Sequence, residues 1–364
     1  MNIKMVLHTL GRMASVAALL MLLPAFVSIF YRETAAYAFF GVAAVTLILG
    51  WLITVLFKPT NQVIYAKEGF AVVAIGWLMF SAIGAAPLTL SGDIPFYVDA
   101  FFEIVSGFTT TGASILKDVE ALSKGALFWR SFTHWVGGMG VLVFVMAIIP
   151  NLSDRSIHIL KAEVPGPVVG KLVPRVKDTA KILYIIYIAL TTIQIILLCV
   201  SGMPLFDSVL HSFGTAGTGG FGIKADSIGG YSPLQQWIIA IFMLVFGVNF
   251  NIYYLIIIRR FRSAVRSGEM WCYFGITAVA SGIITVNILS KFSSFSDALR
   301  HSVFQVASII TTTGYATTDF DLWPGLSKTV LLILMFTGAC AGSTAGGLKL
   351  SRVIMLFKMI GREL

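Results

Sequence analysis

A short string of threonine and glycine occurs three times in the chain, each time directly after a short apolar run. The strings end at Gly112, Gly220 and Gly314, and large apolar residues recur ten and eleven positions before each glycine. An aspartate lies thirteen residues before the first two glycines but seventeen before the third, which predicts a third lead-in longer by one helical turn. An internal repeat constrains architecture more than any single motif. The sequence therefore predicts three structural repeats.

The composition places these repeats in a membrane. The chain is 57% hydrophobic and only 12% charged, whereas soluble domains carry about 25% charged residues, and its mean hydropathy is +0.88. The three cysteines stand singly in apolar runs, so we interpret them as packing residues. Stretches of about 20 apolar residues can cross a bilayer. Eight such spans are predicted: Met13–Phe30, Ala36–Phe57, Gly69–Leu90, Ala126–Pro150, Ile182–Gly202, Leu234–Ile258, Trp271–Ser290 and Leu326–Leu348.

Three further apolar stretches, one before each threonine–glycine string, are too short to cross. They fit re-entrant half-helices, because irregular backbone at membrane depth has to be buried or to line a cavity. From Gly69 onward the order is span, half-helix, loop, span, repeated three times. Each unit crosses the membrane an even number of times. All three loops are therefore predicted to open on the same side, around an axis along the membrane normal.

The distribution of charge agrees with this topology when the N-terminus is placed inside. Of the 26 Lys and Arg residues, 18 then fall on the inner side, as the positive-inside rule requires. Of the 17 Asp and Glu residues, 11 fall on the outer side. A negative outer vestibule would concentrate cations. The alternative is that the acids cap the half-helices, and we expect Asp99 and Asp207 to do both.

The repeated loops have the chemistry of a cation filter. Backbone carbonyls can replace the water around a cation, glycine permits the φ values that align them, and threonine adds a hydroxyl oxygen. Each half-helix also directs roughly −0.5 of a charge from its C-terminus toward the loop. The alternative for one copy is an ordinary small-residue contact or cap. Three aligned copies favour the filter.

At these residues the chain resembles the membrane (TrkH-type) subunit of Trk potassium uptake systems, in the Trk/Ktr/HKT cation transporter superfamily. The resemblance runs along the whole chain. Besides the three loops it is carried by Trp135–Gly140, His301–Gln305, Thr317–Pro324 and Ala341–Lys349. It implies K⁺ uptake through a carbonyl- and hydroxyl-lined filter in an all-α polytopic membrane protein. Its helix–pore-loop–helix units surround a pseudo-fourfold pore axis and follow two N-terminal transmembrane helices.

The resemblance also divides the chain. Residues 1–67 would hold the two N-terminal helices, and residues 68–178, 179–268 and 269–364 would be pore repeats 1, 2 and 3. By motif match the K⁺ ligands are Thr110, Thr111, Gly112, Thr218, Gly219, Gly220, Thr312, Thr313 and Gly314. K⁺ is the only metal expected, at these residues alone, and no organic cofactor is expected. Each loop has one repeat glycine rather than the richer string of K⁺ channels, which predicts looser discrimination among K⁺, Rb⁺ and Na⁺.

A run of small residues, 342–347, interrupts the last predicted span. The resemblance makes it an intramembrane gating loop of repeat 3; the alternative is a small-residue helix-packing site. Lys349, just beyond, either lines the inner cavity or extends to the interface. Gly137, Gly138 and Gly140 are interpreted as packing residues. The gating residues so assigned are Gly342, Ser343, Thr344, Ala345, Gly346, Gly347 and Lys349.

The family pattern has four repeats, and a fourth is absent here. The filter glycines are separated by 108 and 94 residues, and the chain ends at Leu364 before another could occur. We expect truncation, with completion by a separate polypeptide or a different assembly as alternatives. The competing functions are therefore a non-conducting truncated or regulatory assembly subunit, and a transporter of another monovalent cation such as Na⁺.

The remaining signals concern partners. The chain has no zinc-protease motif, nucleophile elbow or phosphate loop, so it is not expected to be an enzyme. The basic inner loops 155–181 and 259–266 predict contact with anionic lipids or an acidic partner. A nucleic acid is not expected as a partner. The resemblance implies a cytosolic nucleotide-binding regulatory ring (TrkA-type), a homodimer, and a bacterial inner (plasma) membrane location with the N-terminus cytoplasmic. Arg130 is interpreted as an interfacial anchor or the partner of a loop carboxylate.

Overall fold

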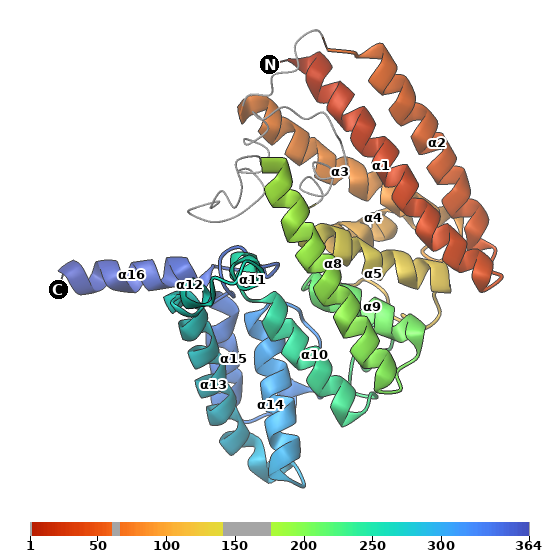
Figure 1. The fold of residues 1–364 in the computed structure, drawn as a ribbon. Coiled ribbons are helices and arrows are strands. Elements are labelled where there is room, and N and C mark those ends of the chain that lie inside the picture. Colours follow the sequence, from red (N-terminus) through yellow and green to blue (C-terminus); the bar gives the residue numbers. More distant parts are fainter. Residues whose placement is uncertain (1, 60–65, 141–175, 364) are drawn as a thin grey trace. The chain divides into compact units, whose positions relative to one another are not determined.

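The computed structural model describes residues 2–59, 66–140 and 176–363, and every regular element in these ranges is a helix (Figure 1). The chain divides into two compact units, Met1–Tyr184 and Ile185–Leu364. The boundary falls inside helix α8 (Val176–Val200). The two units are described separately below.

The first unit contains helices α1 (Ile3–Phe30), α2 (Ala35–Leu56), α3 (Ala66–Leu90), α4 (Tyr97–Phe108) and α5 (Lys124–Gly138). Helix α1 contacts α2 and α3, and α4 lies against α3 and α5. The crossing of α1 and α2 is close because both helices carry glycine there. A Cβ placed on Gly50 would lie only 2.7 Å from the carbonyl oxygen of Gly11. Small residues permit this approach of two backbones, as is common between membrane helices.

The second unit is built around helix α14 (Phe295–Ile310), which contacts α10, α13 and α15. Its Phe304 and Ile310 side chains are fully buried. The other helices of the unit are α9 (Leu205–Ala216), α10 (Pro233–Phe246), α11 (Phe250–Ile257), α12 (Phe261–Val265), α13 (Gly268–Ile288), α15 (Gly325–Phe336) and α16 (Leu350–Glu363), with 3-10 turns η1 (Leu289–Lys291) and η2 (Phe320–Leu322).

The three short lead-ins form the predicted half-helices. Helices α4 and α9 have 12 residues each, and α14 has 16. The third is therefore longer by about one turn of 3.6 residues, as the position of its aspartate indicated. Each half-helix ends directly before its threonine–glycine string.

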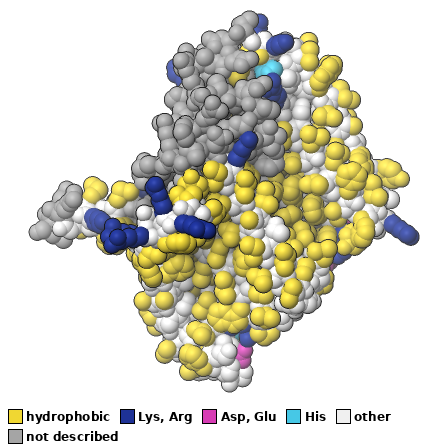
Figure 2. Space-filling model, in the orientation of Figure 1, with side chains coloured by type: hydrophobic (Ala, Val, Ile, Leu, Met, Phe, Trp, Pro, Cys, Tyr) yellow, Lys and Arg dark blue, Asp and Glu magenta, His cyan; other side chains and the backbone are white. Residues whose placement is uncertain are grey.

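The membrane spans agree with the prediction in part. Five of the described helices are long and apolar enough to cross a bilayer, or six if the bent pair α10–α11 is one span. Figure 2 shows hydrophobic side chains over much of the visible face, and soluble proteins rarely expose contiguous apolar patches of this kind. The second half of the predicted span Ala126–Pro150 lies outside the described residues, because α5 ends at Gly138 and the description ends at Gly140.

Two predicted spans are not continuous helices. The span Leu234–Ile258 bends by 90° between α10 and α11, and the span Leu326–Leu348 is helical only as far as Phe336. The first break occurs because Asn249 caps α11 by accepting a hydrogen bond from the Asn251 N–H. Apolar composition alone predicted an unbroken helix, since Gly247–Asn249 is only a short interruption of a long hydrophobic run.

The packing interpretation of Gly137 yields a testable prediction. A Cβ at Gly137 in α5 would lie 2.0 Å from the carbonyl oxygen of Phe108, the last residue of α4, whereas a Cβ at Gly41 in α2 would meet nothing within 4 Å. We expect Gly137→Ala to destabilise the protein by about 1–3 kcal/mol, the usual cost of overpacking. Gly41→Ala should have little effect. Thermal unfolding of the purified variants in detergent measures the difference, and equal melting temperatures would contradict the contact.

Candidate functional site: three filter loops and a broken helix

The three threonine–glycine loops share one backbone conformation. The second residue after each half-helix is a threonine, Thr110, Thr218 or Thr312, with φ of +54°, +52° and +56°. In each loop the N–H of this threonine and the N–H of the next residue bond back to carbonyls of the last helical turn, at 2.8–3.1 Å. This pair of bonds is the Schellman motif that closes helix C-termini. The sequence repeat is therefore also a structural repeat.

Threonine in this position is unusual. The left-handed region favours glycine, and a β-branched residue with φ above zero is a genuine outlier. Such a conformation costs on the order of 1–3 kcal/mol and persists only where the surroundings enforce it, most often at functional sites. Three equivalent outliers make these loops candidates for a functional role. Sequence reasoning missed this feature, although a threonine two positions before each repeat glycine was the available signal.

The repeat glycines have the conformation that was predicted for them. Gly112, Gly220 and Gly314 have φ of +74°, +75° and +90°. A Cβ on Gly220 would lie 1.9 Å from the carbonyl oxygen of Thr313, so the second and third loops are in direct backbone contact. The structure thus brings together Thr218–Gly220 and Thr312–Gly314 within the second unit. Thr110–Gly112 lies in the first unit.

Threonine hydroxyls stabilise the loops from within. In the first loop the hydroxyls of Thr109 and Thr111 lie 2.8 Å apart, and those of Thr311 and Thr313 repeat this contact at the same distance in the third loop. The second loop has glycine at both equivalent positions. A hydroxyl that donates one hydrogen bond keeps lone pairs for another partner. The loops can therefore present oxygen ligands without any formal charge.

The predicted gating residues 342–347 and Lys349 lie in the non-helical segment between α15 and α16, hereafter the 337–349 segment. Gly342 and Gly347 have φ of +73° and +70°, which a helix does not allow. The segment is therefore not a helix-packing face. The Lys349 side chain is only 2% exposed and its Nζ donates to the Ala345 carbonyl, so it does not extend to an interface.

The 337–349 segment is hydrogen-bonded directly to two of the threonine–glycine loops. The Thr218 hydroxyl donates to the Thr344 carbonyl at 3.0 Å, and the Gly346 N–H donates to the Thr312 hydroxyl oxygen at 2.7 Å. These are the two threonines with positive φ in the second unit. A movement of the segment would therefore break or strain a hydrogen bond to each of these two loops.

The same segment completes the bend between α10 and α11. The Cys340 N–H donates to the Gly247 carbonyl at 3.1 Å, and the Phe250 N–H donates to the Gly342 carbonyl at 3.0 Å. Backbone groups freed by one broken helix thus pair with those of another. In a bilayer, where water cannot serve as partner, this pairing is what makes both breaks tolerable.

A buried ion pair lies behind the first loop. Arg130 of α5 donates from Nε to the Glu103 carboxylate of α4 at 2.8 Å, and both residues are at most 1% exposed. The same carboxylate accepts hydrogen bonds from the Ser114 hydroxyl at 3.0 Å and the Ile115 N–H at 3.1 Å. Arg130 is therefore the partner of a carboxylate, located on the half-helix rather than in the loop, and it is not an interfacial anchor.

Mostly neutral groups support the loops of the second unit. The Tyr231 hydroxyl donates to the Asp207 carboxylate at 2.8 Å and lies 3.0 Å from His211 Nε2. The Gln236 side-chain amide donates to the carbonyls of Ile228, Gly229 and Tyr231.

The expectation that Asp99 and Asp207 cap their half-helices is wrong. The cap positions are Phe96 and Pro204, and neither makes a side-chain cap hydrogen bond. Both acids lie in the first turn, where the helix dipole still favours a negative charge.

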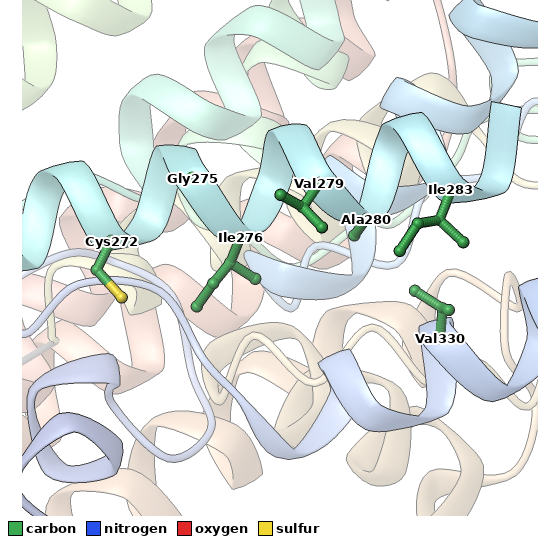
Figure 3. Close-up of a pocket in the computed structure, with 7 residues that line it drawn as sticks. All are labelled: Cys272, Gly275, Ile276, Val279, Ala280, Ile283 and Val330. Atoms are coloured by element: carbon green, nitrogen blue, oxygen red, sulfur yellow. The ribbon is translucent and has the colours of Figure 1, made fainter. Parts of the chain in front are cut away.

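Two other features of the described residues bear on where an ion or ligand could bind. No cluster of three or more His, Cys, Asp or Glu side chains suitable for a metal occurs in the residues that the structure describes. A groove of about 470 Å³ runs along α13 and faces Val330 of α15, as Figure 3 shows. Apart from the Cys272 thiol, the side chains that line the groove are hydrocarbon. Such a surface is suited to contact with acyl chains rather than with cations.

The Glu103–Arg130 pair leads to a prediction for stability. Arg130→Met leaves a buried carboxylate without its cation, so we expect destabilisation of about 3–5 kcal/mol. Adding Glu103→Gln should recover part of this loss, because the amide oxygen can still accept from Ser114 and Ile115 without carrying charge. Asp297→Asn, which alters the partly exposed pair with Arg300, is the control and should change little, because water still reaches the Asp297 carboxylate. Thermal unfolding of the variants in detergent measures these differences. A double variant no more stable than Arg130→Met would contradict the proposed penalty for the unpaired carboxylate.

Several known proteins are similar to this chain in sequence and in fold. Residues 36–364 match the family described as TrkH, cation transport protein. The Trk system potassium uptake protein TrkH of Salmonella typhimurium is 35% identical over 373 residues, covering 100% of this chain and 77% of that protein. The Trk system potassium uptake protein TrkG of Escherichia coli is 33% identical over 374 residues, covering 100% of this chain and 76% of that protein.

The structural comparison agrees. The crystal structure of the potassium transporter TrkH from Vibrio parahaemolyticus matches with a TM-score of 0.87 and 30% identity, covering 100% of this chain and 76% of that one. The relatives are transporters, and the apolar helices make this chain a multi-pass membrane protein. Because a family match covers most of the chain and relatives above 30% identity align along its whole length, the chain belongs to the TrkH family of cation transport proteins.

Proposed function

We propose that this protein takes up potassium across the bacterial inner membrane, with its N-terminus in the cytoplasm. The observation that carries the proposal is the threefold loop in which a left-handed threonine precedes a left-handed glycine by two residues. Family membership and the names of the relatives as potassium uptake proteins support the choice of K⁺. The positive-inside distribution of Lys and Arg supports the orientation.

The K⁺ ligands are proposed to be oxygens of Thr110–Gly112, Thr218–Gly220 and Thr312–Gly314. Neutral carbonyl and hydroxyl oxygens can replace hydration without binding the ion so tightly that it cannot leave. The C-terminal ends of α4, α9 and α14 add partial negative charge directly before the loops. Repeats at 68–178, 179–268 and 269–364 remain our division of the chain, after two N-terminal helices within 1–67.

The segment with residues 342–347 and Lys349 is proposed as the gate of this pathway. Its hydrogen bonds to Thr218 and Thr312 support this role, because they join the segment to two of the three filter loops. Its non-helical backbone is tolerable at membrane depth because its polar groups have protein partners in the conformation seen. Opening would then consist of exchanging these partners.

The names of the relatives describe a Trk system, which indicates more than one component. A nucleotide-binding ring of TrkA type on the cytoplasmic side, a homodimer of the membrane subunit and contacts with anionic lipids are our proposals for its assembly. Arg259, Arg260, Arg262 and Arg266 around α12 are exposed and supply positive charge for such contacts. Most of the other basic loop, 155–181, lies outside the described residues.

Rubidium uptake tests the proposed transport. We expect the complete gene to restore ⁸⁶Rb⁺ uptake, and growth at low potassium, in a bacterium that lacks its own potassium uptake systems. Stronger competition by excess K⁺ than by excess Na⁺ would identify K⁺ as the preferred substrate, and partial competition by Na⁺ agrees with the loose discrimination predicted for these loops. Correctly inserted protein without uptake would contradict the proposal, and equal competition by Na⁺ would favour transport of another cation.

The geometry of the filter glycines makes a second test possible. A Cβ on Gly220 would collide with the Thr313 backbone, whereas one on Gly314 would meet nothing within 4 Å. We expect Gly220→Ala to abolish ⁸⁶Rb⁺ uptake. Gly314→Ala should only reduce it, because the cost is a left-handed alanine of roughly 1–2 kcal/mol without a clash.

Gly268→Ala is the matched control for these variants, since its surroundings are open and its φ is ordinary. It should transport like the unmodified protein at equal membrane abundance, measured by immunoblot. If Gly220→Ala transported as well as Gly268→Ala, the second loop could not be part of the filter.

A further inference from the structure

Glu269 bridges a point within the 337–349 segment and the start of α16. It lies in the first turn of α13, and its Oε1 atom accepts hydrogen bonds from the Ala341 N–H at 2.8 Å and from the Ser351 N–H at 3.1 Å. These two donors are ten residues apart along the chain and flank the proposed gating residues. A single carboxylate oxygen from another helix thus fixes the position of the segment at Ala341 and the position of the first turn of α16 at Ser351.

The two bonded N–H groups need this acceptor. Ser351 is in the first turn of α16, where N–H groups have no partner within their own helix. A carboxylate at this point is also favoured by the helix dipole. The Ala341 N–H belongs to non-helical backbone, which in membrane surroundings costs free energy when it is left unpaired. Removing the Glu269 carboxylate would therefore leave two polar groups unsatisfied at once.

The first turn of α13 does not itself require the Glu269 side chain. Ser267 is the N-cap of α13 and accepts a hydrogen bond from the Met270 N–H. The carboxylate is consequently available for the neighbouring segment. Its placement serves the segment rather than the helix that carries it.

Charge ties Glu269 to the same segment. The buried Lys349 side chain lies within electrostatic range of Glu269, and its Nζ donates to the Ala345 carbonyl inside the segment. Backbone pairing adds to this, since the Gly338 N–H donates to the Leu348 carbonyl at 2.8 Å and the Leu350 N–H to the Ala339 carbonyl at 3.2 Å. The segment is thus a closed loop whose base is held by Glu269 and whose other contacts reach the filter threonines.

We propose that Glu269 is a positioning residue of the gate: its carboxylate holds the 337–349 segment in the conformation in which Thr344 and Gly346 are bonded to the filter loops. It touches no ion in this role and acts only through the segment. This inference rests on the proposed gating function of residues 342–347. It predicts that loss of the carboxylate favours the open conformation.

Cysteine labelling measures the conformation independently of transport. Ser343→Cys introduces a reporter in the segment, and the signal of the same proteins without it is subtracted to remove the native cysteines. In Glu269→Ala we expect labelling by a membrane-permeant maleimide to be at least about tenfold faster, which corresponds to about 1.4 kcal/mol. Basal ⁸⁶Rb⁺ uptake should rise in parallel in the complete protein with its native partners.

Two variants control this measurement. Glu269→Gln keeps an oxygen that can accept both N–H groups, so it should stay much closer to the unmodified protein than Glu269→Ala. Asp319→Asn alters a carboxylate that accepts a backbone N–H in an outer loop of the same unit, and it should change neither readout. Membrane abundance by immunoblot identifies any variant that fails to fold. If Glu269→Ala is lost in this way, Glu269→Met replaces it, because methionine keeps most of the side-chain volume and lacks the carboxylate, and it should show the same acceleration.

The outcomes separate this inference from the proposed function. If the unmodified protein transports Rb⁺ and Glu269→Ala labels and transports at the unmodified rate, the positioning role is wrong while the transport function stands. If Glu269→Ala accelerates labelling but no form of the protein transports Rb⁺, the carboxylate holds the segment and the transport proposal falls. Equal acceleration in the alanine and glutamine variants would overturn the assignment to the two hydrogen bonds.

Discussion

The structure depends on the pairing of backbone polar groups where helices are interrupted within the membrane. Water is not available there, and each unpaired N–H or carbonyl costs several kcal/mol. The protein interrupts its helices at Gly247–Asn249 and again after Phe336. Each break supplies hydrogen-bond partners for the other, through Cys340 to Gly247 and Phe250 to Gly342. Neither irregular stretch could exist alone at this depth.

The threonine–glycine loops depend on neighbouring backbone in the same way. Their threonines adopt a left-handed conformation that is unfavourable for a β-branched residue, and Schellman hydrogen bonds from the half-helices hold them there. In the second unit the hydroxyls of Thr218 and Thr312 then pair with the 337–349 segment. Strain in the loops and irregularity in the segment are therefore stabilised by the same contacts. This arrangement would allow a movement of the segment to change the filter.

The supports behind the loops are not equivalent, although the loops are. The first loop relies on the buried pair of Glu103 and Arg130, whereas Tyr231, His211 and Gln236 provide mostly neutral hydrogen bonds in the second unit. A buried ion pair fixes geometry but leaves a severe penalty if one partner is lost. Losing one hydroxyl or amide partner leaves no buried charge behind and costs less. The more severe penalty therefore falls in the unit that does not contain the 337–349 segment.

The sequence alone determined the repeat, the half-helices and their unequal lengths, and the positive φ of Gly112, Gly220 and Gly314, because hydrophobic length and glycine chemistry are local properties. It also located the interruption at 342–347 by its small residues. It could not determine the bend at Gly247–Asn249, the burial of Lys349, or the partners of Arg130 and Glu269. Those features depend on which N–H and carbonyl groups from distant parts of the chain meet, and only the packed tertiary structure decides which of them find partners.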